Sequence, residues 1–258
     1  ITFYDDPLRI LRAIRFSNRL DFKLDEKMYQ AAENKELTAR LQIVSRQRYN
    51  KELAEILSGE NALSGFQGLF DMHVFEEVFL RILNVSMDKE LDVHTIYRRT
   101  VDIWKEYAVG AQLLKEKLYI NALETELNTL YYLISLLSVG LAINEALLAH
   151  DAPTSIADVS VAVRFLTEPA KKKQSYKTMP VMWYIARVCC ASTNVVAETL
   201  SSAQMYRTLL ESKELASEHH ILLFRRYNKQ TVLLCLCTLA LTSHFEGLLA
   251  SYRLDDPT

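Results

Sequence analysis

The chain has 258 residues, of which 50% are hydrophobic and 24% are charged, and its formal net charge is −2. A charge so close to zero excludes a chain that binds RNA through an overall excess of positive charge, so any RNA contact would need a local basic surface. Only 6 glycines and 5 prolines occur, and this scarcity of turn-forming residues favours long helices joined by short loops. We therefore expect an all-α chain, without strands longer than a few residues.

The first strong pattern is a helix with two different faces, from about Pro7 to Leu20. Asp6 stands just before Pro7, and an acidic cap followed by proline in the first turn is a common way for a helix to begin. At about 100° per residue, apolar and basic side chains fall on opposite sides. The apolar side comprises Ile10, Leu11 and Ile14, and the basic side comprises Arg9, Arg12, Arg15 and Arg19. One face is thus expected to be buried, and the other to carry guanidinium groups.

Asp6 and Arg9 are three residues apart, so both side chains can project from the same side of the first turn. A carboxylate only accepts hydrogen bonds and a guanidinium only donates them. Cytosine and adenine present an amino donor beside a ring-nitrogen acceptor, so this pair could select C and A and refuse U and G. Arg12, Arg15 and Arg19 would then be available for phosphate or sugar. The spacing equally allows a purely structural role, in which Asp6 is a cap paired with Arg9 and the other arginines form a solvated face.

Two short elements, at residues 25–34 and 35–41, precede a longer predicted helix over residues 45–57. In this helix Arg48 and Glu52 are four residues apart, and we expect them to form an ion pair.

Residues 61–72 predict another helix, and His73 after it is interpreted as a partner for its C-terminal dipole. Residues 76–85 complete this first part of the chain, and the polar residues 86–91 are expected to be a linker. Long helices follow. They are expected at about residues 93–112, 118–140, 155–166, 180–191, 195–212 and 215–245.

Two basic clusters in the second half could meet RNA. One comprises Lys171, Lys172, Lys173 and Lys177, interleaved with Tyr176, and the other comprises Arg225, Arg226 and Lys229, flanking Tyr227. Lysines suit a phosphate backbone and a tyrosine can stack on an exposed base. The alternative is a solvated loop and a solvated helix end.

Four cysteines lie in apolar helical stretches, without CxxC spacing or nearby histidines. They are Cys189, Cys190, Cys235 and Cys237. We expect buried free thiols in a reducing compartment, and hence an intracellular protein. No signal segment and no run of eighteen apolar residues is apparent, so no membrane contact is expected.

Two stretches resemble known motifs. Residues 5–16, DDPLRILRAIRF, resemble the neck motif of class II tRNA nucleotidyltransferases, the CCA-adding enzymes and bacterial poly(A) polymerases. That motif is an acidic pair, two variable residues, Arg, and then Leu-Arg-Ala-x-Arg-Phe; Asp5 stands where Glu is usual. Residues 45–53, SRQRYNKEL, resemble the family's Ser-x-Glu/Gln-Arg-Ile-x-x-Glu-Leu helix, with Tyr49 where Ile is commoner. The motifs cover about the first quarter of the chain.

The resemblance implies a role for each matched residue. Asp6 and Arg9 would read the incoming base, Arg12 and Arg15 would belong to the nucleotide site, and Arg48 and Glu52 would be structural braces. Residues 1–85 would form the neck, and residues 86–258 an elongated helical body or tail that binds tRNA. The implied partners are CTP, ATP and the tRNA 3′ end, and Arg19 is a further candidate for RNA contact.

The family's chemistry needs Mg²⁺ held by paired carboxylates, which lie in an N-terminal head domain of mixed α/β type. The chain has no Asp-x-Asp and no phosphate-binding Gly-rich loop. We therefore expect no catalytic residue and no metal ligand in this chain, which begins abruptly at Ile1 and is interpreted as a fragment that is inactive alone. Two alternatives stay open: a poly(A) polymerase of the same family, and a non-catalytic all-α module that interacts with RNA or protein.

Overall fold

The computed structural model describes residues 2–81, 83–84, 91–117, 124–150, 181–189 and 229–241, together with residues 196, 199, 200, 202, 203 and 206. All regular structure in these residues is helical and none is strand, which confirms the all-α prediction. The first helices are α1 (Thr2–Asp5), α2 (Leu8–Leu20), α3 (Glu26–Ala32), α4 (Lys35–Ala39), the 3₁₀ helix η1 (Arg40–Ile43), α5 (Arg46–Leu57), α6 (Ala62–Asp71) and α7 (Val74–Phe79). The later ones are α9 (Val93–Lys117), α10 (Glu124–His150), α12 (Val181–Val188) and α15 (Lys229–Ala240).

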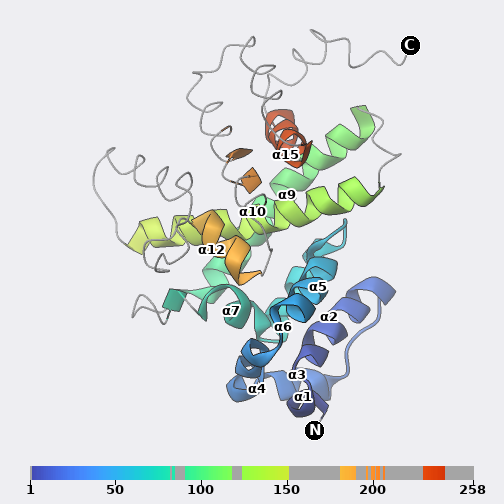
Figure 1. Ribbon diagram of the computed structural model, residues 1–258, viewed down its shortest axis with the longest axis vertical. Helices are drawn as coiled ribbons and strands as arrows, with labels where there is room; N and C mark the ends of the chain where they lie inside the picture. Colours follow the sequence, from blue (N-terminus) through green and yellow to red (C-terminus); the bar gives the residue numbers. More distant parts are fainter. Residues whose placement is uncertain are drawn as a thin grey trace.

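The long helices α9 and α10 pack on each other and form the middle of the molecule (Figure 1). Helices α1 to α6 gather on the side of this pair that holds the N-terminus, and α15 lies on the opposite side (Figure 1). One hydrophobic cluster includes buried residues from both parts of the chain. The helices with the two sequence motifs therefore lie at one end of a continuous core.

Helix α2 begins and ends close to its predicted limits. Its inward face is apolar, and Leu8, Ile10, Leu11 and Ile14 are buried. Asp21 follows the helix in the left-handed backbone conformation, with φ of 51°, and its N–H donates to the carbonyl of Ser17. Helices α3 and α4 each begin at a side-chain cap. Asp25 accepts from the N–H of Lys27 and Asn34 accepts from the N–H of Glu36, both at 2.9 Å.

Two glycines of α6 allow close packing against the helices that carry the motifs. A Cβ atom on Gly68 would lie 2.7 Å from Cγ2 of Ile14 in α2, and one on Gly65 would overlap the backbone carbonyl of Ile56 in α5. Helix α6 thus contacts both α2 and α5, which also contact each other. The absence of side chains at these two positions helps to hold α2 and α5 side by side.

Helix α10 differs most from its predicted limits. It runs ten residues past the expected end at Gly140, and its segment Glu126–Ala149 contains an 18-residue stretch with a mean hydropathy of 1.7, so it is long and apolar enough to cross a membrane by length and composition. Within the protein, 61% of that apolar stretch is buried. It packs against α5, α6, α9, α12 and α15. Its apolar character is thus accounted for by its central position in the bundle, and the absence of membrane contact stays a prediction.

A chain of polar contacts joins the middle of the bundle to α5. Trp104 of α9 donates through Nε1 to Oγ of Ser135 in α10 at 3.0 Å, and the same hydroxyl lies 2.9 Å from the carbonyl oxygen of Leu57, the last residue of α5. Both contacts are buried. They tie the end of a motif helix to the core of the second part of the chain.

Three of the four cysteines lie in the part of the chain that the structure describes, and all three are buried thiols outside any disulfide, as expected. Burial raises the pKa of Cys235 to about 12 and that of Cys237 further above its ordinary value. Cys190, the fourth, lies outside the described residues.

Candidate functional site

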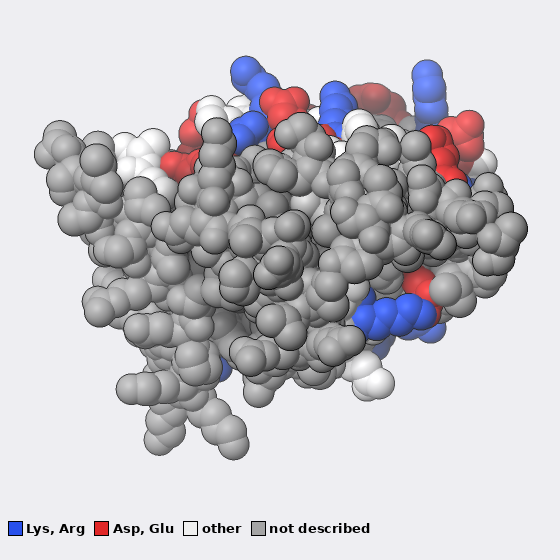
Figure 2. Space-filling model, turned by 90° about the horizontal axis from the view of Figure 1, so that it is seen from above, with Lys and Arg blue, Asp and Glu red and all other residues white. Residues whose placement is uncertain are grey.

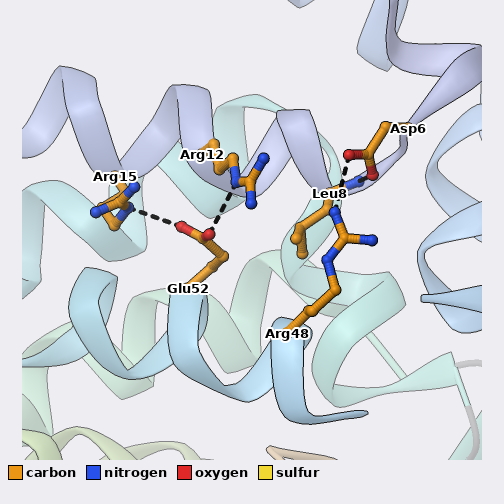
Figure 3. A network of polar contacts seen from close by, with 6 residues as sticks. All are labelled: Asp6, Leu8, Arg12, Arg15, Arg48 and Glu52. Atoms are coloured by element: carbon orange, nitrogen blue, oxygen red, sulfur yellow. Dashed lines mark hydrogen bonds and ion pairs between the residues drawn. The ribbon is translucent and has the colours of Figure 1, made fainter. Parts of the chain in front are cut away.

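Asp6, just before α2, is held at both carboxylate oxygens (Figure 3). Oδ1 accepts from the backbone N–H of Leu8 at 3.2 Å, and Oδ2 accepts from Nη2 of Arg48 at 3.0 Å. Partial burial tends to raise the pKa of Asp6, but the hydrogen bond and charge of Arg48, with the N–H of Leu8 and the charge of Arg12, hold it below its ordinary value of 3.8. Asp6 is therefore an ionised hydrogen-bond acceptor near neutral pH.

Glu52 of α5 is buried between two arginines of α2 (Figure 3). Its Oε1 accepts from Nε of Arg12 at 2.9 Å, and its Oε2 lies 2.7 Å from Nε of Arg15. The second contact is an ion pair without the alignment of a hydrogen bond, because neither of its atoms has a hydrogen-bond partner. Two guanidinium groups thus share one buried carboxylate.

The predicted ion pair between Arg48 and Glu52 does not form. Because α5 lies alongside α2, both side chains reach across to the neighbouring helix, Arg48 to Asp6 and Glu52 to Arg12 and Arg15. If Asp6 had only a structural role, the sequence predicted that it would pair with Arg9. In the structure its carboxylate pairs with Arg48 instead. The bracing contacts run between the two motif helices and not within either of them.

The arginines of α2 differ in how much of each remains accessible. Arg9 and Arg19 are exposed, the Arg12 side chain is 41% exposed, and that of Arg15 is 18% exposed. The guanidinium of Arg15 also lies over the ring of Phe16, 4.3 Å from its centroid. The helical pattern alone predicted that Arg12 and Arg15 would be unengaged, whereas in the structure the Nε of each lies against Glu52 and only the rest of each guanidinium could meet phosphate or sugar.

Both basic clusters predicted to meet RNA lie outside the described residues except for Lys229, which begins α15 and forms an ion pair with Glu126 of α10. The other members are Lys171, Lys172, Lys173, Lys177, Arg225 and Arg226, and their contact with RNA stays a prediction. Where the structure describes side chains on the face in Figure 2, basic and acidic groups lie next to one another along its upper edge. This mixture agrees with the net charge near zero.

The described residues offer no fit for a metal ion. Among them, no three His, Cys, Asp or Glu side chains gather closely enough to hold one. The two carboxylates of the site are each engaged by arginine, whereas Mg²⁺ prefers carboxylates that are free to bind it.

The arrangement places one partly exposed carboxylate and several arginines on and beside α2, with α5 bracing that helix. Asp6 supplies an acceptor at its first turn, and Arg9, Arg12 and Arg48 supply exposed or partly exposed positive charge around it. Such a surface suits a ligand that carries both a hydrogen-bond donor and negative charge.

Curated proteins similar to this chain are tRNA nucleotidyltransferases. The chain is 28% identical over 109 residues to the tRNA nucleotidyltransferase cca2 of Schizosaccharomyces pombe, covering 42% of this chain and 22% of the relative. It is 37% identical over 79 residues to the mitochondrial CCA tRNA nucleotidyltransferase of Saccharomyces cerevisiae, covering 30% and 14%. It is 36% identical over 77 residues to the CCA-adding enzyme of Lactobacillus helveticus, covering 30% and 18%.

The matched segments thus span about a fifth or less of each of these relatives. No family model and no solved structure matches the chain significantly. The similarities support a relationship with the tRNA nucleotidyltransferases at the level of the family.

Proposed function

We propose that this chain is the neck and body part of a CCA-adding tRNA nucleotidyltransferase. Residues 1–85 would form the neck that reads the incoming base, and residues 86–258 the helical body or tail that holds tRNA. The observation that carries the proposal is the pairing of the two motif helices, in which Arg48 holds Asp6 while Glu52 holds the arginines of α2. The similarity to CCA-adding relatives supports the same assignment.

In this proposal the base lies against Asp6 and Arg9. Asp6 accepts from the amino group of cytosine or adenine, and Arg9 donates to the adjacent ring nitrogen. Uracil and guanine place a carbonyl oxygen where the amino group should be, so they would face the carboxylate with an acceptor. Arg12 and Arg15, fixed by Glu52, would line the nucleotide site. CTP and ATP are the substrates that satisfy this pattern.

The reaction itself is assigned to a head domain joined to this chain. Mg²⁺ bound there would stabilise the attack of the tRNA 3′ end on the α-phosphate. The chain alone would bind nucleotide and tRNA without adding nucleotides. The enzyme would act inside the cell, in the cytoplasm or an organelle.

A gel-shift titration with tRNA lacking its 3′ CCA tests the binding part of this proposal. The wild-type chain should retard the tRNA, and a variant with both Arg9→Ala and Arg12→Ala should bind less tightly, because it loses two positive charges near the site. Equal binding by both would favour a module that uses another surface. In the complete enzyme, incorporation of ATP without CTP would favour the poly(A) polymerase alternative.

A further inference from the structure

The two charged residues of α5 that reach α2 differ in their surroundings. The Glu52 side chain is 7% exposed, whereas that of Arg48 is 51% exposed and its partner Asp6 is 26% exposed. A buried charge that is removed leaves its partners uncompensated, while an exposed ion pair contributes little to stability. Glu52 therefore fits a structural brace, and the contribution of Arg48 has to be sought elsewhere.

Arg48 is one of two groups that hold the Asp6 carboxylate in place. The N–H of Leu8 holds Oδ1 and Nη2 of Arg48 holds Oδ2, so the plane of the carboxylate is set by contacts from two different helices (Figure 3). Each carboxylate oxygen has two acceptor positions. One position on each oxygen is used by these contacts and one on each remains, in a side chain that is 26% exposed. A ligand's amino group can thus be accepted without displacing Arg48.

We propose that Arg48 is a positioning residue for base recognition, which orients Asp6 so that the carboxylate accepts from amino-bearing bases. This inference rests on the proposed function, since it assigns base reading to Asp6. Without Arg48, Asp6 keeps its cap to Leu8 but its second oxygen is free to turn. The expected consequence is a loss of selection between bases, with little loss of stability.

The test compares CTP with UTP, which carry the same sugar and phosphates and differ at the base edge. Each is titrated into the ¹⁵N-labelled 258-residue chain, and the backbone amide of Leu8 and the side-chain Nε–H of Arg48 report on the two contacts of Asp6. For the wild type, CTP is expected to bind about tenfold more tightly than UTP, within the range of a good bidentate contact. CTP should shift both signals, and UTP should shift neither at the same saturation.

The variant Arg48→Met keeps the aliphatic length and removes the charge and the donors. We expect its CTP-to-UTP ratio to fall to about threefold or less, through weaker binding of CTP. Arg48→Lys restores the charge with a single donor and should recover part of the ratio. Arg98→Met removes an exposed arginine of α9 and serves as the matched control, with an unchanged ratio. The thermal midpoints of all variants should lie close to that of the wild type.

The outcomes separate this inference from the function on which it rests. If the wild type binds neither CTP nor UTP, or binds them equally, the base-reading function fails and the inference fails with it. If the wild type discriminates and Arg48→Met keeps the full ratio, only the role of Arg48 is contradicted. If Arg48→Met does not fold, the wild-type signals decide, since a CTP complex that leaves both the Leu8 and Arg48 signals unmoved contradicts the inference.

Discussion

At the scale of single residues, the site depends on how two carboxylates are compensated by arginine. Asp6 is ionised because Arg48 and Leu8 donate to it, and Glu52 lies in a buried position between Arg12 and Arg15. One carboxylate is therefore partly open to a ligand, and the other is enclosed. This difference leads to separate predictions for the two groups.

The pH dependence of stability tests the charge state of Asp6. Burial tends to raise the pKa of Asp6, but the hydrogen bond and charge of Arg48, the N–H of Leu8 and the charge of Arg12 together hold it below the ordinary value of 3.8 in the folded chain. Folding therefore favours the ionised form, and the stabilising contribution is complete above about pH 4 and is lost as pH falls through the lowered value. Asp6→Asn should remove this contribution, so the unfolding free energies of variant and wild type should converge at acidic pH. Asp5→Asn, at the exposed neighbour, is the control, because it removes a carboxylate that neither Arg48 nor the N–H of Leu8 contacts. Unfolding free energies of Asp6→Asn and wild type that differ by the same amount at every pH would contradict the prediction.

Glu52→Gln tests the enclosed carboxylate. The amide keeps the shape but leaves Arg12 and Arg15 without a counter-charge, and we expect the unfolding free energy to fall by about 1–3 kcal/mol, as for other hydrogen bonds to charged groups. Denaturant unfolding measures the change. Glu55→Gln, on the exposed side of the same helix, is the matched control and should change it by less than about 0.5 kcal/mol. Equal losses in both variants would show that Glu52 does not brace the helices.

At the scale of helices, the contacts of Arg48 and Glu52 with α2 depend on the close packing of α2, α5 and α6. Gly65→Ala would push a methyl group into the carbonyl of Ile56, which belongs to the backbone and cannot turn away. We expect a loss of about 1–3 kcal/mol in unfolding free energy, although alanine is the better helix former. Ser64→Ala, an exposed neighbour in α6, should be neutral or slightly stabilising. A stabilised Gly65→Ala variant would contradict the close contact between α5 and α6.

Many helix limits could be predicted from the sequence because the residues that start a helix lie at the start itself. Pro7, the apolar spacing after it, and the caps at Asp25 and Asn34 place helix starts within a residue or two. The end of α10 was missed because an apolar run gives no stop signal inside a buried helix. The partners of Arg48 and Glu52 could not be predicted either, since their spacing within one helix favours a local pair whereas their real partners are about 40 residues away.

At the scale of the whole molecule, the end of the bundle that carries the two motif helices is continuous with the rest. The hydroxyl of Ser135 connects Trp104 in α9 with the end of α5, and Tyr184 of α12 donates to the carbonyl of Phe79 in α7 at 2.6 Å. Buried polar contacts of this kind fix helices in one arrangement. The proposed tRNA-binding body thus holds the helices of the proposed neck in place. The proposed function requires a catalytic head domain as well.

Nucleotide choice during addition to tRNA tests whether Asp6 and Arg9 read the incoming base. The chain is fused behind the head domain of a CCA-adding relative and given Mg²⁺, tRNA that lacks its 3′ CCA, and either CTP or UTP. The account predicts that the wild-type fusion incorporates C and refuses U. It also predicts that Asp6→Ala lowers this preference by about tenfold or more, the size of one good bidentate contact. An Asp6→Ala fusion that still incorporates C and refuses U as strictly as the wild type would contradict it.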